Sequence, residues 1–121
     1  MPFKNRILIC DDEEGVRESL RLILEKDYNL IFANSGEMCL EMLQCEKEIN
    51  LVLIDIKMPK INGIEVMREI KKTYPGLPII VVTGYKSSEI AQEATEAGAC
   101  EYIVKPFDSK ELIKCINIHI I

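Results

Sequence analysis

An apolar run near the middle of the chain, residues 51–54, leads directly into a carboxylate, Asp55. An unbroken apolar run is typical of a strand that is buried on both faces, as in a parallel sheet with helices on each side. Pro59 follows soon after and cannot donate to a sheet, so the strand has to end before it. Binding sites in such sheets gather at the carboxyl ends of the strands. The run therefore predicts a central strand and makes Asp55 the first candidate functional residue, although an acid there can also simply cap a turn.

Strand-like and helix-like segments alternate along the whole chain. Strands are predicted at residues 7–10, 28–33, 51–55, 78–83 and 101–104. Between and after them, apolar residues recur three or four positions apart, which is the spacing of a helix with one buried face. Polar residues that can cap these helices precede four of them: Ser35, Asn62, Ser87 and Asp108. The alternation predicts an α/β fold with right-handed crossovers, that is, a doubly wound five-stranded parallel sheet.

The helix predicted for residues 87–97 has a thin apolar face. Its inward positions are mainly Ile90, Ala94 and Ala97, and Gly98 is expected to end it. A helix that buries little apolar surface needs little energy to shift. This segment is therefore the candidate moving element of the fold.

Composition limits what else the chain can be. Its 121 residues are the usual size of one domain, so a single domain over residues 1–121 is expected. A net charge of −5 argues weakly against a nucleic-acid surface. No apolar stretch is long enough to cross a membrane, and the apolar run near the N-terminus is too short for a signal peptide. We therefore expect no membrane contact and no direct nucleic-acid binding.

The cysteines and the single histidine carry no evident chemistry in the sequence. Five cysteines, an odd number with no C-x-x-C pair, suggest reduced thiols and a cytoplasmic location. Cys10 and Cys100 are expected to be small buried hydrophobic residues. His119 is expected to be a solvated side chain near the end of the last helix.

Three of the five aspartates follow predicted apolar strands: Asp11, Asp12 and Asp55. The first and third strands of a doubly wound sheet can lie side by side, which would bring these carboxylates together. Like charges at close range repel, so the pKa of at least one should rise unless a cation neutralises them. Hard carboxylate oxygens with open water positions suit Mg²⁺. The alternative is three independent, solvated caps.

Two other strand ends carry polar groups of different chemistry. Thr83 supplies a hydroxyl after the fourth strand and Lys105 an ammonium after the fifth. Together with a metal ion, they would surround a tetrahedral anion carried on one carboxylate. Phosphoryl transfer requires mainly positioning and charge neutralisation, and an aspartate can be its nucleophile.

At these positions the chain resembles the receiver domains of bacterial response regulators, the phosphoacceptor half of two-component signalling. The matching residues are Asp11-Asp12, Asp55, Thr83-Gly84, Tyr102 and Lys105-Pro106, together with the segment 55–59 and Gly63. The resemblance covers nearly the whole chain and implies the flavodoxin-like (βα)5 receiver fold.

The resemblance also implies a chemical role for each acid. Asp55 would accept a phosphoryl group from a phosphohistidine on a sensor histidine kinase or phosphotransfer protein. Asp55 and Asp12 would bind Mg²⁺ directly, Asp11 mainly through water, and the backbone carbonyl of Lys57 would complete the protein ligands. Lys105 would pair with the phosphoryl oxygens, and its bond to Pro106 is expected to be cis, turning the ammonium toward the site.

A switch is implied as well. Thr83 would move to bind a phosphoryl oxygen and Tyr102 would turn inward. The face formed by the fourth helix, the fifth strand and the fifth helix would then control an output domain, a partner protein or a second copy of the chain. Departures from the family pattern are slight: Asn62 stands where many members have Asp. The resemblance also implies that Lys57 and Tyr85 occupy loop positions that, in the family, tune the lifetime of the phosphorylated state.

Three alternatives remain. A flavodoxin-like cofactor binder shares the fold, but its first loop cradles a phosphate, which the acidic residues 11–14 would repel. A haloacid-dehalogenase-type phosphatase needs a second acid two residues after the nucleophile, where this chain has Lys57. A receiver-like module that binds partners without phosphorylation would be expected to lack Asp55, Thr83 or Lys105, and all three are present.

Overall fold

Five strands alternate with five helices in a computed structural model that describes residues 4–46 and 48–120. The strands are β1 (Arg6–Cys10), β2 (Asn29–Ala33), β3 (Ile49–Ile54), β4 (Ile79–Thr83) and β5 (Ala99–Val104). The helices are α1 (Glu14–Leu24), α2 (Gly36–Cys45), α3 (Gly63–Thr73), α4 (Ser88–Glu96) and α5 (Ser109–His119). The predicted alternation is confirmed. Within the described ranges, no helix has the length and hydrophobicity needed to cross a membrane.

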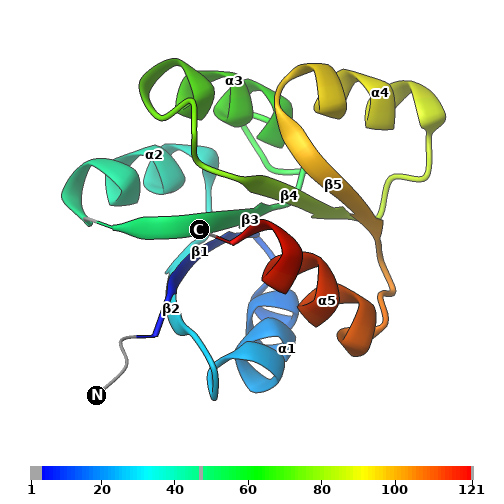
Figure 1. Ribbon diagram of the computed structural model, residues 1–121. Coiled ribbons are helices and arrows are strands. Elements are labelled where there is room, and N and C mark those ends of the chain that lie inside the picture. The colour runs from blue at the N-terminus through cyan, green and yellow to red at the C-terminus, as the bar shows by residue number, and fades with distance from the viewer. Residues whose placement is uncertain (1–3, 47, 121) are drawn as a thin grey trace.

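The strands form one parallel sheet in the order β2-β1-β3-β4-β5. Helices α1 and α5 cover one face, and α2, α3 and α4 cover the other (Figure 1). Strand β3 therefore lies at the centre, flanked by β1 and β4, as its apolar sequence predicted. Because all strands are parallel, the residues that follow them meet at one edge of the sheet.

The predicted caps start the helices that they precede. Ser35, Asn62 and Ser87 each accept a backbone N–H three residues on, and Asp108 accepts one two residues on. Helix α4 ends near Gly98, whose φ of +116° is a conformation that favours glycine. Only Ala94 of α4 is fully buried, together with Ala97 just beyond its end, so the predicted thin apolar face is confirmed.

A β-bulge at the start of β5 corrects the prediction for Cys100. Ile79 pairs with Ala99 and Ile80 pairs with Glu101, so Cys100 has no partner on β4. A bulged residue leaves the inside-outside alternation of its strand. Cys100 is therefore exposed, with its thiol donating to the carbonyl oxygen of Ile79, whereas Cys10 is buried as expected.

Gly63, the first residue of α3, packs directly on the end of β3. A Cβ atom placed on Gly63 would lie 2.3 Å from the carbonyl oxygen of Asp55. We expect Gly63→Ala to lower the free energy of unfolding by about 1–3 kcal/mol, the usual cost of overpacking a core. Urea unfolding measures this change. The matched control is Gly15→Ala in α1, where a Cβ meets no atom within 4 Å and the helix should gain stability. Equal effects of the two substitutions would contradict the packing described here.

Candidate functional site

Four acidic side chains converge where β1 and β3 end. These strands are neighbours, with Cys10 opposite Ile54, so the residues that follow them, Asp11 and Asp55, lie side by side. The backbone N–H of Asp55 also donates to the carbonyl oxygen of Cys10 at 3.0 Å. Each member of the group offers a carboxylate oxygen, and all of these atoms lie within 4.8 Å of one another: Asp11, Asp12, Glu13 and Asp55. The structure therefore brings together the three predicted aspartates and adds Glu13.

Lys105 extends from the end of β5 into this group. Its Nζ donates to Asp11 Oδ2 at 2.8 Å and to Asp55 Oδ2 at 3.0 Å, and lies 3.7 Å from Glu13 Oε1. The Lys105–Pro106 peptide bond is cis, as predicted. One ammonium thus bridges the two buried aspartates, which come from two different strand ends.

Burial dominates the electrostatics of these groups. Asp11 is 2% exposed and Asp55 is 3% exposed. Burial raises the pKa of Asp11, and the charge of Asp55 adds to this rise, although hydrogen bonds from Lys105 and from the Glu13 N–H oppose it. Burial alone would lower the pKa of Lys105, but its hydrogen bonds and its attraction to Asp11 and Asp55 outweigh burial and raise it. The pocket therefore favours a cation beside its carboxylates.

The raised pKa of Asp11 predicts a pH dependence of stability. An acid whose pKa is higher in the folded than in the unfolded chain binds its proton more tightly when folded. The stability that this bound proton contributes is fully present below the pKa of Asp in the unfolded chain, about 3.9. It is lost as the pH rises through the higher pKa of Asp11 in the folded chain. Without metal, we expect Asp11→Asn to remove this loss, so the variant should gain stability relative to wild type as pH rises over this range. Denaturant unfolding from pH 3.5 to 7 measures the difference, and a constant difference would contradict the prediction.

Backbone groups fix the remaining carboxylate oxygens. The N–H of Lys57 donates to Asp55 Oδ1 at 3.1 Å, and the N–H of Glu13 donates to Asp11 Oδ1 at 2.9 Å. Arg17 on α1 donates from Nη1 to the backbone carbonyl of Asp11 at 2.7 Å. Neither Glu13 nor Arg17 was predicted from the sequence to belong to the site. The acidic run at residues 11–14 was a signal for Glu13, but no local pattern indicates that Arg17 reaches back to Asp11.

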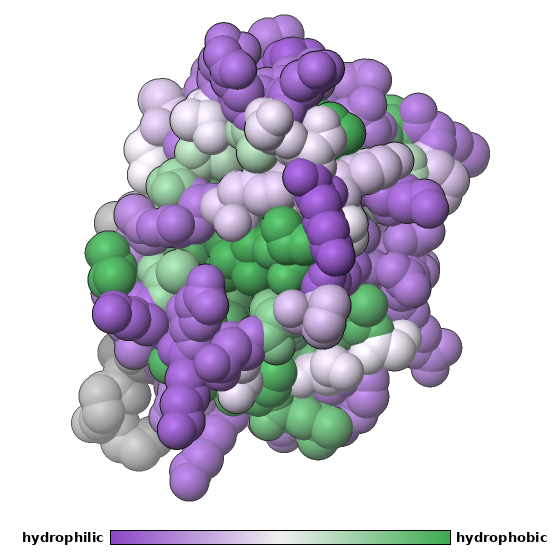
Figure 2. All heavy atoms as spheres, turned by 90° about the vertical axis from the view of Figure 1, so that its right-hand side faces the viewer, coloured by the Kyte–Doolittle hydropathy of each residue, from purple (hydrophilic) through white to green (hydrophobic). Residues whose placement is uncertain are grey.

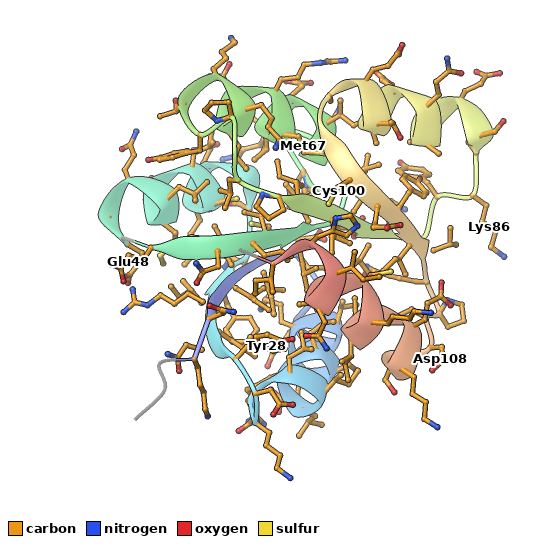
Figure 3. All side chains as sticks on the ribbon, viewed as in Figure 1. Tyr28, Glu48, Met67, Lys86, Cys100 and Asp108 are labelled. Atoms are coloured by element: carbon orange, nitrogen blue, oxygen red, sulfur yellow. The ribbon has the colours of Figure 1, made fainter. Side chains whose placement is uncertain are left out.

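A cavity of about 300 Å³ opens above Asp55. Its lining includes Lys57, Thr83 and Lys105, so a ligand inside it would meet the carboxylate, the hydroxyl and the ammonium together. Lys86 and Asp108 lie at the same edge of the sheet, whereas Glu48 lies at the opposite edge (Figure 3). Figure 2 looks onto the side of the molecule that carries this edge, where hydrophilic residues surround a smaller apolar area.

Thr83 and Tyr85 border the cavity, and Tyr102 lies on the neighbouring strand β5. Thr83 is fully buried, and its Oγ1 accepts the N–H of Tyr85 at a long 3.5 Å. The hydroxyl of Tyr102 donates to the carbonyl oxygen of Tyr85 at 2.9 Å, so this ring is directed toward the loop between β4 and α4. Burial raises the pKa of Tyr102, with the charge of Asp55 as a further cause. The predicted switch residues thus lie next to the acidic group.

The donor set fits a hard divalent cation. Carboxylate oxygens, with waters in the remaining positions, are the ligands that Mg²⁺ prefers. Asp11 and Asp55 present buried oxygens, while Asp12 and Glu13 are exposed to solvent. Lys57 is also exposed and lies in the loop directly after Asp55. The identity of the ion, and the Lys57 carbonyl as its ligand, remain predictions.

Comparison with known proteins gives consistent matches over nearly the whole chain. The family described as response regulator receiver domain matches residues 7–117. The response regulator MprA of Mycobacterium leprae is 41% identical over 93% of this chain and 49% of its own length. The transcriptional regulatory protein ZraR of Escherichia coli K12 is 38% identical over 88% of this chain and 24% of its own length. The chain thus spans about half or less of these relatives.

Solved structures of receiver domains superpose closely on this chain. A CheY-like response regulator receiver domain protein from Methanospirillum hungatei superposes with a TM-score of 0.90 at 36% identity, covering 95% of this chain and 92% of that one. A receiver domain protein from Clostridium thermocellum gives a TM-score of 0.89 at 33% identity, covering 95% and 93%.

Proposed function

The chain belongs to the response regulator receiver domain family of two-component systems, and we propose that Asp55 is its phosphoacceptor. The observation that supports this most strongly is the bridge from Lys105 to Asp11 and Asp55 beside the cavity that Thr83 lines. A nucleophile, a cation and a hydroxyl there surround a space open to solvent. The donor would be a phosphohistidine on a sensor histidine kinase or phosphotransfer protein.

The reaction would form one bond and break another on the same phosphorus atom. A carboxylate oxygen of Asp55 attacks the phosphorus, and the bond from phosphorus to the histidine nitrogen breaks as its electron pair returns to the imidazole. The Lys57 N–H and the Lys105 ammonium hold the two oxygens of Asp55 before attack. Lys105 can then follow the transferred charge to the phosphoryl oxygens. Mg²⁺, when bound by Asp11, Asp12, Asp55 and the Lys57 carbonyl, would neutralise charge on those oxygens.

The phosphorylation itself tests this proposal. Incubation with acetyl phosphate and Mg²⁺ should add one phosphoryl mass to the intact protein, and hydroxylamine should remove it. The alternative, a receiver-like module that binds partners without phosphorylation, predicts no added mass. The chemistry proposed for this domain is limited to its own phosphorylation and the slow hydrolysis of that phosphate.

Thr83 and Tyr102 would report the phosphorylated state. A phosphoryl group in the cavity offers acceptor oxygens close to Thr83, and movement of Thr83 would disturb the loop to which Tyr102 donates. Helix α4 packs next to this loop through few buried residues, so it can shift at low cost. The α4–β5–α5 face would then bind an output domain, a partner protein or a second copy of the chain.

We expect Thr83→Ala to separate phosphorylation from this switch. The variant should still take up one phosphoryl group, because Asp55 and Lys105 are unchanged. Its Tyr102 and α4 chemical shifts should move much less on phosphorylation than those of the wild type. Two-dimensional NMR of both proteins with acetyl phosphate measures this. Thr95→Ala is the control, since Thr95 Oγ1 donates to the Ala91 carbonyl within α4. Equal shifts in wild type and Thr83→Ala would exclude Thr83 as the link.

The biological setting is also a proposal. The relatives named above are regulators whose length exceeds that of this chain, so residues 1–121 are proposed as a receiver domain that controls an output unit. In this scheme the domain works in the cytoplasm and contacts nucleic acid only through such a unit. The negative net charge supports this division, because phosphate contacts need clustered basic residues.

A further inference from the structure

The one histidine of the chain does not extend freely into solvent as its position near the end of α5 had suggested. His119 Nε2 lies 2.8 Å from Oε2 of Glu101 on β5. The two side chains are 26% and 37% exposed, so the contact is partly shielded from water. Helix α5 runs alongside the sheet with its last turn close to the strands (Figure 1). An imidazole nitrogen and a carboxylate oxygen therefore meet far from the carboxyl edge where α5 begins.

A cysteine lies one turn before His119 on the same helix. Cys115 and His119 are four residues apart, which places both side chains on one face of α5. Cys115 is partly buried and packs against the core below β5. Its pKa is raised, first by burial and then by the charges of Glu101 and of Glu111.

The bulge in β5 is what directs Glu101 to this helix. The unpaired Cys100 shifts the register, and Glu101 then pairs with Ile80, whose side chain belongs to the core on the α5 side. Strand residues that pair directly point to the same face of the sheet. Without the extra residue, Glu101 would point to the α4 side. The fold thus places the Glu101 oxygen beside the His119 nitrogen, with the Cys115 sulfur on the same face of α5 as that nitrogen.

We propose that Cys115, His119 and Glu101 form a site for a borderline-soft divalent ion such as Zn²⁺, with water as the fourth ligand. Thiolate and imidazole favour such ions over Mg²⁺, which the all-oxygen pocket at Asp55 favours instead. Binding would release the Cys115 thiol proton to solvent. The ion would then tie the last turn of α5 to the edge strand.

Side-chain movement is needed to complete the site. Its three donor atoms do not yet lie within 4.8 Å of one another, as those of the acidic pocket do. A tetrahedral ion holds nitrogen and oxygen ligands about 3.4 Å apart, for bonds of about 2.1 Å. The His119–Glu101 pair therefore has to open by a few tenths of an ångström. The site also requires Cys115 to turn its sulfur toward the His119–Glu101 pair.

Co²⁺ is the probe that tests this site, because a thiolate bound to Co²⁺ gives a near-ultraviolet charge-transfer band. The reduced chain is titrated with Co²⁺ in excess Mg²⁺, which fills the acidic pocket. We expect one equivalent of Co²⁺ to produce the band, and one equivalent of Zn²⁺ to remove it. Cys115→Ser should abolish the band. His119→Gln should weaken binding by more than about tenfold, which is the smallest loss usually seen when even an outer partner of a metal ligand is mutated.

Two exposed cysteines supply matched controls. Cys100→Ser changes the neighbouring residue on β5 (Figure 3), and Cys45→Ser changes a thiol on α2; both should leave the band and the affinity unchanged. Absence of the band in wild type, its survival in Cys115→Ser, or undiminished binding by His119→Gln would each overturn the proposal. Phosphorylation of Asp55 by acetyl phosphate is measured in the same variants and should be unchanged. Failure of the metal site is thus distinct from failure of the proposed function.

Discussion

Asp55→Asn is expected to abolish phosphoryl uptake from acetyl phosphate. The substitution preserves the size of the side chain, and its one amide oxygen can replace one of the two Asp55 oxygens that accept from Lys57 and Lys105. It removes the negative charge that makes the carboxylate a nucleophile and a metal ligand. Intact mass after incubation with acetyl phosphate and Mg²⁺ should show one phosphoryl group on wild type and none on the variant.

Asp108→Asn is the control for this experiment. Asp108 is an exposed helix cap at the same edge of the sheet as Asp55 (Figure 3), and it accepts the N–H of Lys110. The chemical change is identical, and asparagine also caps helices well. This variant should be phosphorylated at the wild-type rate. Equal labelling of Asp55→Asn and wild type would mean that the phosphoryl group goes to another residue.

Mg²⁺ is expected to raise the melting temperature of the wild type by several degrees. The carboxylates are brought together only in the folded chain, so Mg²⁺ should bind the folded state in preference to the unfolded one. At a hundred times its dissociation constant, such a ligand stabilises by about 2.7 kcal/mol. For a domain of this size, that change moves the midpoint by several degrees. Thermal melts with and without Mg²⁺, at fixed ionic strength, measure it.

The variant that tests this most cleanly is Asp12→Ala. Asp12 is exposed and has no ion pair with Lys105, so its removal relieves repulsion within the acidic group without breaking the Lys105 bridge. Without metal, the variant should melt at or above the wild-type temperature, and it should lose most of the rise with Mg²⁺. Asp55→Asn is less clean, since it removes both a repulsive charge and one partner of Lys105.

Asp27→Ala supplies the matched charge change for this comparison. Asp27 is exposed in the turn before β2, away from the acidic group. The Asp27→Ala variant should therefore keep the full rise in melting temperature with Mg²⁺. An equal Mg²⁺ shift in wild type, Asp12→Ala and Asp27→Ala would show that the carboxylates do not form one cation site.

The strand ends explain why much of this site was predictable. Apolar runs that stop at Asp11, Asp55, Thr83 and Lys105 place these residues at one edge once the sheet is known to be parallel. A parallel sheet fixes that edge without any knowledge of side-chain contacts. The meeting of Asp11 and Asp55 needed one further condition, that β1 and β3 are neighbours, and the sheet order satisfies it.

Two kinds of contact were not predictable: those that depend on a change of strand register, and those that depend on where a helix begins or how it packs. The extra residue at Cys100 reverses the inside-outside pattern in β5, and nothing in the local sequence marks the bulge. The Glu101–His119 contact depends on that bulge and on how α5 packs, so it was missed. The Arg17 contact with the Asp11 carbonyl requires the exact start of α1, which periodicity places only to within a few residues.

Reductive trapping of the phosphoprotein tests the central claim most directly. Borohydride reduces an aspartyl phosphate to homoserine, which is stable and can be located by peptide sequencing in a mass spectrometer. Wild-type protein, treated with acetyl phosphate and Mg²⁺ and then with borohydride, should carry homoserine at position 55 and aspartate at positions 11 and 12. Homoserine at position 11 or 12, or a stable phosphate on Thr83 with Asp55 unchanged, would contradict the assignment of Asp55 as the phosphoacceptor.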